Sequence, residues 1–243
     1  LAGSPQFTGT GISYVAMTSA GYSLEGLPAD RSWSGSKTGD DLSFTGGARG
    51  LWIEKASNGP SRIVEDDGSS RTIEEDAREP MLSSDETSLA FLRDDHGRGR
   101  LFVRRNFQSE SASNTVLTPP SLNVYEASFL SEREYAFSAV RGQGRPEIYL
   151  TDTLHANSPL YLGEARYPAL SPDGRWLAYS RFDRGAWNLW LRDEQSGATR
   201  RIADVPCNQI EATWENDSKT LLYGSDCGRS LWFTAVARRR VVP

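Results

Sequence analysis

The sequence predicts an all-β protein built from a repeated unit of four antiparallel strands, and three observations support this prediction. Short stretches that alternate apolar and polar residues, typical of half-buried strands, recur along the 243 residues. The 22 glycines and 12 prolines are spread through the chain, as expected where turns join many short strands. The stretch 171–191 combines a Pro-Asp-Gly turn with two aromatic-rich strands, and its pattern returns elsewhere.

An aromatic residue near the end of each Leu-Ala-Tyr-like strand marks the period of this repeat. These anchors are Tyr14, Phe44, Phe91, Phe137, Tyr179 and Tyr223. Their spacings are 30, 47, 46, 42 and 44 residues, and four of the five are close to the length of one four-stranded propeller blade. We therefore expect a single β-propeller domain over 1–243 with antiparallel blades. The repeats are expected near 1–28, 29–75, 76–118, 119–163, 164–203 and 204–243.

The first repeat is irregular. The distance from Tyr14 to Phe44 leaves too little chain for a full outer strand, so the sequence predicts six blades with an abbreviated N-terminal blade. Five blades, with an N-terminal strand added to the rim of the ring, are the alternative. The polar and acidic segment 65–76 is expected to be a solvated loop between blades.

Three aspartates, Asp85, Asp173 and Asp217, occupy one register of the repeat, in the turn before the anchor strand. A carboxylate at this position accepts hydrogen bonds from backbone N–H groups two residues further on and holds the turn. The periodic aromatic residues are expected to pack between blades and not to bind a cofactor. We therefore interpret both sets of residues as scaffold.

Composition and motifs argue against several classes of function. The net charge is −5 with no lysine-rich block, which disfavours a nucleic-acid partner. No window approaches the ~20 apolar residues that span a bilayer. The abrupt start at Leu1 is expected of a processed chain or of a piece of a longer protein, and a membrane tether outside this chain is one of the expectations.

The usual catalytic and metal-binding constellations are missing from the sequence. No Gly-x-Ser-x-Gly elbow precedes a helical pattern, and the two histidines, His96 and His155, are expected in exposed turns. Two histidines and two cysteines without short spacings do not form a zinc motif. The sequence therefore predicts no catalytic residue, no metal ligand and no cofactor.

Carboxylates near the propeller axis are the exception. Glu79, Glu126 and Glu211 fall by repeat register near the starts of the innermost strands, where the central channel opens. Two carboxylates across a cleft are sufficient for glycoside hydrolysis. A glycoside hydrolase is therefore an alternative, although solvation of the channel rim is the interpretation that we favour.

The two cysteines fall in loops of the last repeat that open on the same face of a propeller. Cys207 lies in the loop that enters the innermost strand, and Cys227 in the loop between the second and third strands. We expect a disulfide between them, with two free thiols as the alternative. A lone pair of this kind suits an oxidising compartment.

The pattern Ser-Pro-Asp-Gly, Leu-Ala-Tyr, Asn-Leu-Trp-Leu and Arg-x-Ile over 171–203 closely resembles the PD40 (WD40-like) repeat of TolB-type propellers. The resemblance covers about residues 29–243. It implies a β-propeller, often extracytoplasmic in bacteria, that frequently serves as a binding or scaffolding module. TolB-type proteins add an N-terminal α/β domain, which these residues do not contain. Similar propellers also cap prolyl-oligopeptidase-like hydrolases, whose separate α/β domain holds the catalytic triad.

The prediction is therefore a non-enzymatic TolB-like propeller, periplasmic or extracellular in a bacterium, that binds a protein or a small ligand on its loop face. The face is the one that carries the loops of the two cysteines. The candidate contact residues are Glu79, Tyr125, Glu126, Tyr167 and Glu211. Besides the hydrolase, a sensory ectodomain of a larger membrane-anchored protein is an alternative.

Overall fold

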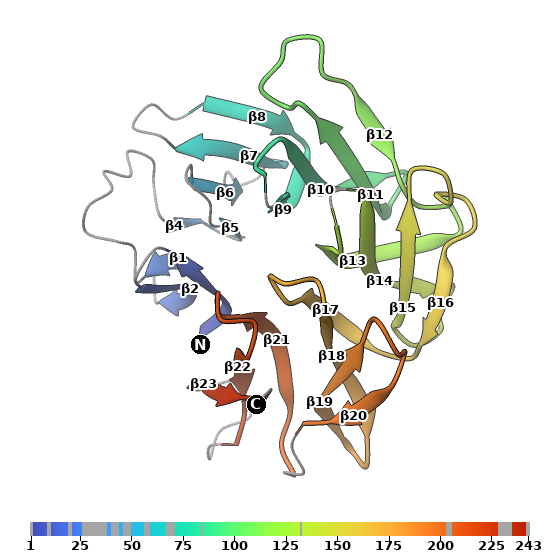
Figure 1. The fold of residues 1–243 in the computed structure, drawn as a ribbon. Coiled ribbons are helices and arrows are strands. Elements are labelled where there is room, and N and C mark those ends of the chain that lie inside the picture. The colour runs from blue at the N-terminus through green and yellow to red at the C-terminus, as the bar shows by residue number, and fades with distance from the viewer. Residues whose placement is uncertain are drawn as a thin grey trace.

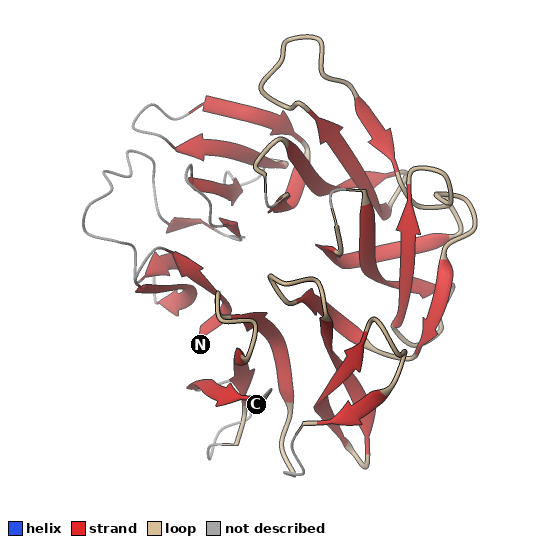
Figure 2. Ribbon diagram, viewed as in Figure 1, coloured by secondary structure: helices blue, strands red, loops and turns tan. Residues whose placement is uncertain are grey.

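The computed structural model describes residues 2–8, 11–18, 21–25, 38–39, 44–45, 50–55, 59–66, 71–83, 85–131, 133–202, 206–227 and 235–241. They form strands and connecting loops (Figure 2). The described strands make six antiparallel sheets, of which five have four strands and one has three. The sheets are arranged around a central axis (Figure 1), so the prediction of an all-β propeller with four-stranded antiparallel blades is confirmed. Within the described residues, no helix is long and apolar enough to cross a membrane.

The strands of the first three sheets follow one another along the chain. The first sheet contains β1 (Ala2–Thr8), β2 (Gly11–Thr18), β3 (Gly21–Glu25) and β4 (Thr38–Gly39). The second contains β5 (Phe44–Thr45), β6 (Gly50–Lys55), β7 (Ser61–Asp66) and β8 (Arg71–Glu75). The third contains β9 (Ala77–Leu82), β10 (Ser88–Asp95), β11 (Arg98–Arg105) and β12 (Asn114–Val116).

The last three sheets repeat this order. The fourth contains β13 (Leu122–Phe129), β14 (Glu134–Arg141), β15 (Glu147–Asp152) and β16 (Leu160–Gly163). The fifth contains β17 (Arg166–Leu170), β18 (Trp176–Asp183), β19 (Ala186–Asp193) and β20 (Thr199–Arg201). The sixth contains β21 (Gln209–Trp214), β22 (Thr220–Ser225) and β23 (Ala235–Arg240). In each sheet the first strand lies nearest the axis (Figure 1).

The hydrophobic core lies between neighbouring sheets. One cluster joins the third and fourth sheets and includes Leu101, Leu117, Leu122 and Phe137. Two further clusters join the second sheet to the third and the fifth sheet to the sixth. Strands that are covered on both faces read as apolar runs, which is why the anchor strands are the most hydrophobic segments of the repeat.

The structure confirms the scaffold role of the repeated residues. The anchors Phe91 and Phe137 are completely buried, and Tyr223 is buried. The carboxylates of the three turn aspartates each accept a backbone N–H from the residue two positions on, at 2.8–3.1 Å. The turn residue is therefore Asp because its side chain replaces the backbone acceptor that a tight turn lacks.

The boundary expected after residue 28 is wrong. Thr38–Gly39 pairs with β3, so the first sheet extends to Gly39 and is not abbreviated. Phe44, which was expected on an anchor strand, lies instead on the innermost strand β5 and pairs with Trp52 on β6. Trp52 occupies the anchor strand of this sheet, 38 residues after Tyr14 and 39 before Phe91. The short first spacing therefore came from one misplaced anchor and not from a missing strand.

The acidic segment 65–76 is not a solvated loop. Its first two residues belong to β7, and Arg71–Glu75 forms β8, the outer strand of the second sheet. Glu74 is buried and accepts hydrogen bonds from Arg93 at 2.5 Å and Arg104 at 2.6 Å, both on the third sheet. The charged residue Glu74 of this strand therefore links the second sheet to the third.

Candidate functional site

The inner strands share an irregularity on which the candidate site is built. The register of β1, β9, β13, β17 and β21 shifts by one residue against the second strand of each sheet. Such a bulge sets two residues opposite one and changes the direction of the side chain there. The shifts enclose Glu79 on β9, Tyr125 on β13, Tyr167 on β17 and Glu211 on β21.

Three of the bulge residues have left-handed backbone conformations. The φ angles are 52° at Glu79, 55° at Tyr167 and 53° at Glu211. A non-glycine residue in this region costs about 1 kcal/mol or more, and it persists only where the surrounding structure imposes it. The same strained conformation on three inner strands shows that the blades impose one geometry on this position, near the N-terminal end of each strand.

Tyr167 is the centre of the resulting cluster. Burial raises the pKa of its hydroxyl, and the carboxylates of Glu126, Glu211 and Glu79 raise this pKa further, whereas the Arg166 guanidinium lowers it. The guanidinium also lies over the Tyr167 ring, 4.5 Å from its centroid. Charges from four different inner strands therefore act on one phenol.

Glu126 and Arg166 form the ion pair of this cluster and join the fourth sheet to the fifth. Arg166 donates to Glu126 Oε1, and the hydroxyl of Ser138 donates to Glu126 Oε2. The exposed fraction is 28% for the Arg166 side chain and 18% for that of Glu126. Burial raises the pKa of Glu126, Arg166 opposes this shift, and the Glu211 carboxylate reinforces it.

Tyr125 occupies the neighbouring position on β13 but faces solvent. It is 40% exposed, and its hydroxyl accepts a hydrogen bond from Asn123 Nδ2 at 2.8 Å. The Oδ1 atom of Asn123 accepts the Gly99 N–H at 2.7 Å. A side chain at Gly99 would come within 2.2 Å of the Val124 carbonyl oxygen, so glycine permits this close approach of two sheets.

All five candidate residues lie on inner strands, near whose starts the repeat register placed Glu79, Glu126 and Glu211. The carboxylates of Glu79, Glu126 and Glu211 all act on the pKa of Tyr167, and Glu211 also acts on that of Glu126. Tyr125 does not contribute to the charges around Tyr167 and offers an exposed ring. Sequence reasoning missed Arg166, although its position just before Tyr167 on an inner strand was a usable signal.

The predicted disulfide is present. Cys207 and Cys227 are bonded, with their Cα atoms 5.1 Å apart. Cys207 precedes the inner strand β21, and Cys227 follows β22, as the repeat alignment predicts. The loops are also joined by Asn208, which donates from its backbone and side-chain nitrogens to Asp226 at 2.6 Å. The loop that leads to Glu211 is therefore anchored.

Both histidines lie in exposed turns, as expected, with His96 98% and His155 64% exposed. Among the residues that the structure describes, no group of three or more His, Cys, Asp or Glu side chains is arranged to hold a metal ion. The inner-strand cluster itself presents carboxylates, a guanidinium group and the exposed ring of Tyr125.

Comparison with known proteins shows which propellers this chain resembles. The TolB homolog of Chlorobium chlorochromatii is 32% identical over 124 residues, which are 48% of this chain and 28% of that protein. The putative TolB of Agrobacterium tumefaciens has a TM-score of 0.67 at 16% identity, over 84% of this chain and 81% of that one. This chain is similar to TolB. The resemblance suggested by the repeat is therefore confirmed, while the chain spans less than a third of the curated TolB homolog.

Two further structures share the TolB-like fold. TolB of Acinetobacter baumannii matches with a TM-score of 0.61 at 16% identity, over 98% of this chain and 65% of that one. A puromycin hydrolase matches with a TM-score of 0.62 at 16% identity, over 98% of this chain and 51% of that one. No protein-family model matches the chain. At these identities the structural matches establish the fold, and the fold occurs in both TolB and a hydrolase.

Proposed function

We propose that this chain is a non-enzymatic TolB-like propeller that binds a protein segment or a small ligand at the inner-strand cluster. The observation that supports the proposal best is that carboxylates from three other inner strands, Glu79, Glu126 and Glu211, all act on Tyr167, while the ring of Tyr125 on β13 is exposed. Mixed acidic and aromatic groups on a rigid scaffold favour recognition, since each is held by a strand and not by a long loop.

The proposal includes a blade count and a location. Six described sheets around one axis support a six-bladed ring. The disulfide supports an extracytoplasmic location, periplasmic or extracellular, because disulfides persist mainly in oxidising compartments. Attachment to a membrane or to a sensory domain would depend on residues outside this chain.

The inner-strand ligand can be tested by photo-crosslinking at Tyr125. Replacement of Tyr125 with p-benzoylphenylalanine places the reactive ketone on an exposed ring beside the cluster. We expect one discrete adduct in extracts of the source organism. The adduct should be lost when the crosslinking protein also carries Glu79→Gln and Glu211→Gln. The control places the same residue at Val116, which is 38% exposed on the outer strand β12. Equal labelling at both positions would contradict the proposal.

A glycoside hydrolase remains the rival function because Glu126 has a raised pKa and lies within the influence of Glu211. A catalytic acid with a second carboxylate nearby is the arrangement that this chemistry needs. The Arg166 and Ser138 contacts occupy both oxygens of Glu126, which favours a structural carboxylate. The test is an assay for hydrolysis of aryl glycosides. Activity in the parent protein that is lost in both Glu126→Gln and Glu211→Gln would support the hydrolase and contradict the binding proposal.

A further inference from the structure

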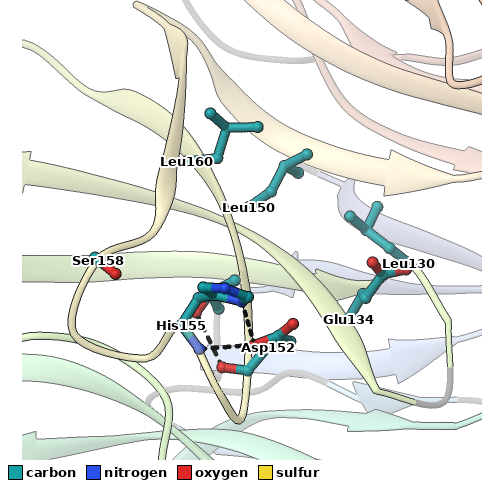
Figure 3. A pocket seen from close by; sticks show the side chains of 8 residues that line it. Leu130, Glu134, Leu150, Asp152, His155, Ser158 and Leu160 are labelled. Carbon is teal, nitrogen blue, oxygen red and sulfur yellow. Dashed lines mark hydrogen bonds and ion pairs between the residues drawn. The ribbon is translucent and has the colours of Figure 1, made fainter.

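A second surface, far from the axis, lies at the outer edge of the fourth sheet. A cavity of about 330 Å³ opens there between the start of β14, the end of β15 and the loop that leads into β16. Figure 3 shows Leu150 and Leu160 near each other, His155 against Asp152, and Leu130 beside Glu134. This volume is at the lower end of the range for ligand-sized sites.

The strand that borders this cavity differs from the other outer strands. The outer strands β8 (Arg71–Glu75), β12 (Asn114–Val116) and β20 (Thr199–Arg201) are rich in polar or charged residues, which discourage pairing with another chain. In contrast, β16 reads Leu-Tyr-Leu-Gly. Leu160 is 61% exposed and Tyr161 51% exposed. Among the described strands β16 has a hydrogen-bonded neighbour, β15, on one side only.

Two rows of side chains on the cavity face lead toward this open edge. Ala136 pairs with Leu150, and Leu150 pairs with Leu160, so three apolar residues form one row across the sheet. Two positions from Ala136 and Leu150 on the same strands, Glu134 pairs with Asp152, and these two residues form an acidic row parallel to the apolar row. Side chains two positions apart on a strand share a face, so both rows border the cavity.

The opposite face carries an aromatic row that ends at the same edge. The rings of Phe137 and Tyr149 are 5.4 Å apart, and those of Tyr149 and Tyr161 are 5.6 Å apart. Phe137 is fully buried, while Tyr161 is half exposed. An added strand beside β16 would continue the aromatic row on one face and the apolar and acidic rows on the other.

Asp152, the member of the acidic row nearest β16, is held by three hydrogen-bond donors. Asp152 accepts hydrogen bonds from the Nδ1 atom of His155 at 2.9 Å and from the backbone N–H groups of Leu154 and His155 at 2.7 Å. The His155 side chain is the main cause of the lowered pKa of Asp152, and the backbone donors add to it. If an added strand places a side chain next to this acidic row, a cationic side chain is therefore expected to bind best there.

We infer that the open edge of β16 binds an extended segment of a partner protein by strand addition. All described strand pairs are antiparallel, and we expect the added segment to pair with β16 in the same way. Read from its N-terminus, the segment then has an aromatic residue, an apolar residue, any residue and a basic residue. The aromatic residue packs on Tyr161, the apolar residue enters the cavity beside Leu160, and the basic residue meets Glu134 and Asp152. A second copy of this chain fits less well, because β16 itself contains no basic residue.

The test uses the folded chain and a fluorescein-labelled peptide, Ser-Val-Tyr-Leu-Thr-Lys-Gly, with fluorescence anisotropy as the readout. We expect saturable binding, about fivefold weaker when the lysine of the peptide is replaced by glutamate, the value of one exposed ion pair. Leu160→Asp is expected to weaken binding at least about tenfold, through the lost apolar contact and the added charge. The matched control, Val116→Asp, makes a similar change on outer strand β12 and is expected to leave binding unchanged.

The acidic row supplies a second criterion, because a misfolded variant would lose binding of both peptides and would not change the preference between them. In Glu134→Lys the preference for the lysine peptide over the glutamate peptide is expected to shrink toward unity, because Asp152 then shares its row with a cation. No saturable binding up to about 1 mM, or an equal effect of Leu160→Asp and Val116→Asp, would overturn the inference. A dimer in sedimentation analysis that Leu160→Asp dissociates would also overturn it and assign the edge to a second copy. None of these outcomes depends on the ligand of the inner-strand cluster.

Discussion

At the scale of single residues, the chain uses side-chain acceptors to hold its turns. Asp217 Oδ1 accepts the backbone N–H groups of Lys219 and Thr220, and Oδ2 accepts the Thr220 hydroxyl, all at 2.8 Å. Slight burial acts to raise the pKa of Asp217, but these donors outweigh it and hold the pKa below its usual value. The ionised form is therefore the one that the turn stabilises.

This pKa shift predicts a pH-dependent effect of Asp217→Asn. A carboxyl whose pKa is lowered by folding contributes stability above its unfolded pKa, about 3.9, and loses it as the pH falls through the folded pKa. The variant should therefore be less stable than the parent protein at pH 7, and the difference should shrink below about pH 4. Urea unfolding across this pH range measures it. A difference that is constant with pH would contradict the role of the charge.

At the scale of strands, β8 shows how charged residues join neighbouring sheets. The buried carboxylate of Glu74 accepts Arg93 and Arg104 from the third sheet, and also Asn114 Nδ2 at 3.2 Å. The guanidinium groups are mostly buried as well, with exposed fractions of 26% and 21%. Removal of the carboxylate leaves two buried cations without their counter-charge, which is more costly than the loss of an exposed pair.

We therefore expect Glu74→Ala to lower the free energy of unfolding by about 3 kcal/mol, the lower end of the range for breaking a buried ion pair. The control is Glu75→Ala on the same strand, where the side chain is exposed. That change should stay within about 0.5 kcal/mol. Denaturant unfolding of both variants measures the two effects. Equal losses would mean that β8 is stabilised by its backbone pairing and not by Glu74.

The strands also show how far the sequence could predict this fold. Anchor spacing located the third to sixth sheets, because the buried aromatics and turn aspartates recur there in register. It failed for the second sheet, where Trp52 takes the anchor strand and the outer strand is acidic. No local pattern reveals that Glu74 meets cations 19 and 30 residues later. Register could place Glu79, Glu126 and Glu211 on inner strands, but Arg166 and the bulges depend on packing between sheets.

At the scale of the whole molecule, the first and last sheets meet. Strand β1 packs against β21 and β22 (Figure 1). The sixth sheet therefore contacts a neighbour on each side, since β21 also packs against β17, β18 and β19. The disulfide fixes the two loops of this sheet, so its effect should reach the first and fifth sheets as well as its own.

The double variant Cys207→Ala/Cys227→Ala tests this role. A link across 20 positions restricts the unfolded chain, and the chain-entropy model gives a stabilisation of about 3 kcal/mol. We expect a loss of this size in the variant, and the same loss when the parent protein is reduced. The variant itself should not respond to reductant, which is the internal control. Hydrogen exchange should rise more in β21, β22 and β1, because these strands pack together, than in β10 and β14. A uniform rise over all sheets would show instead that the disulfide stabilises the propeller only globally.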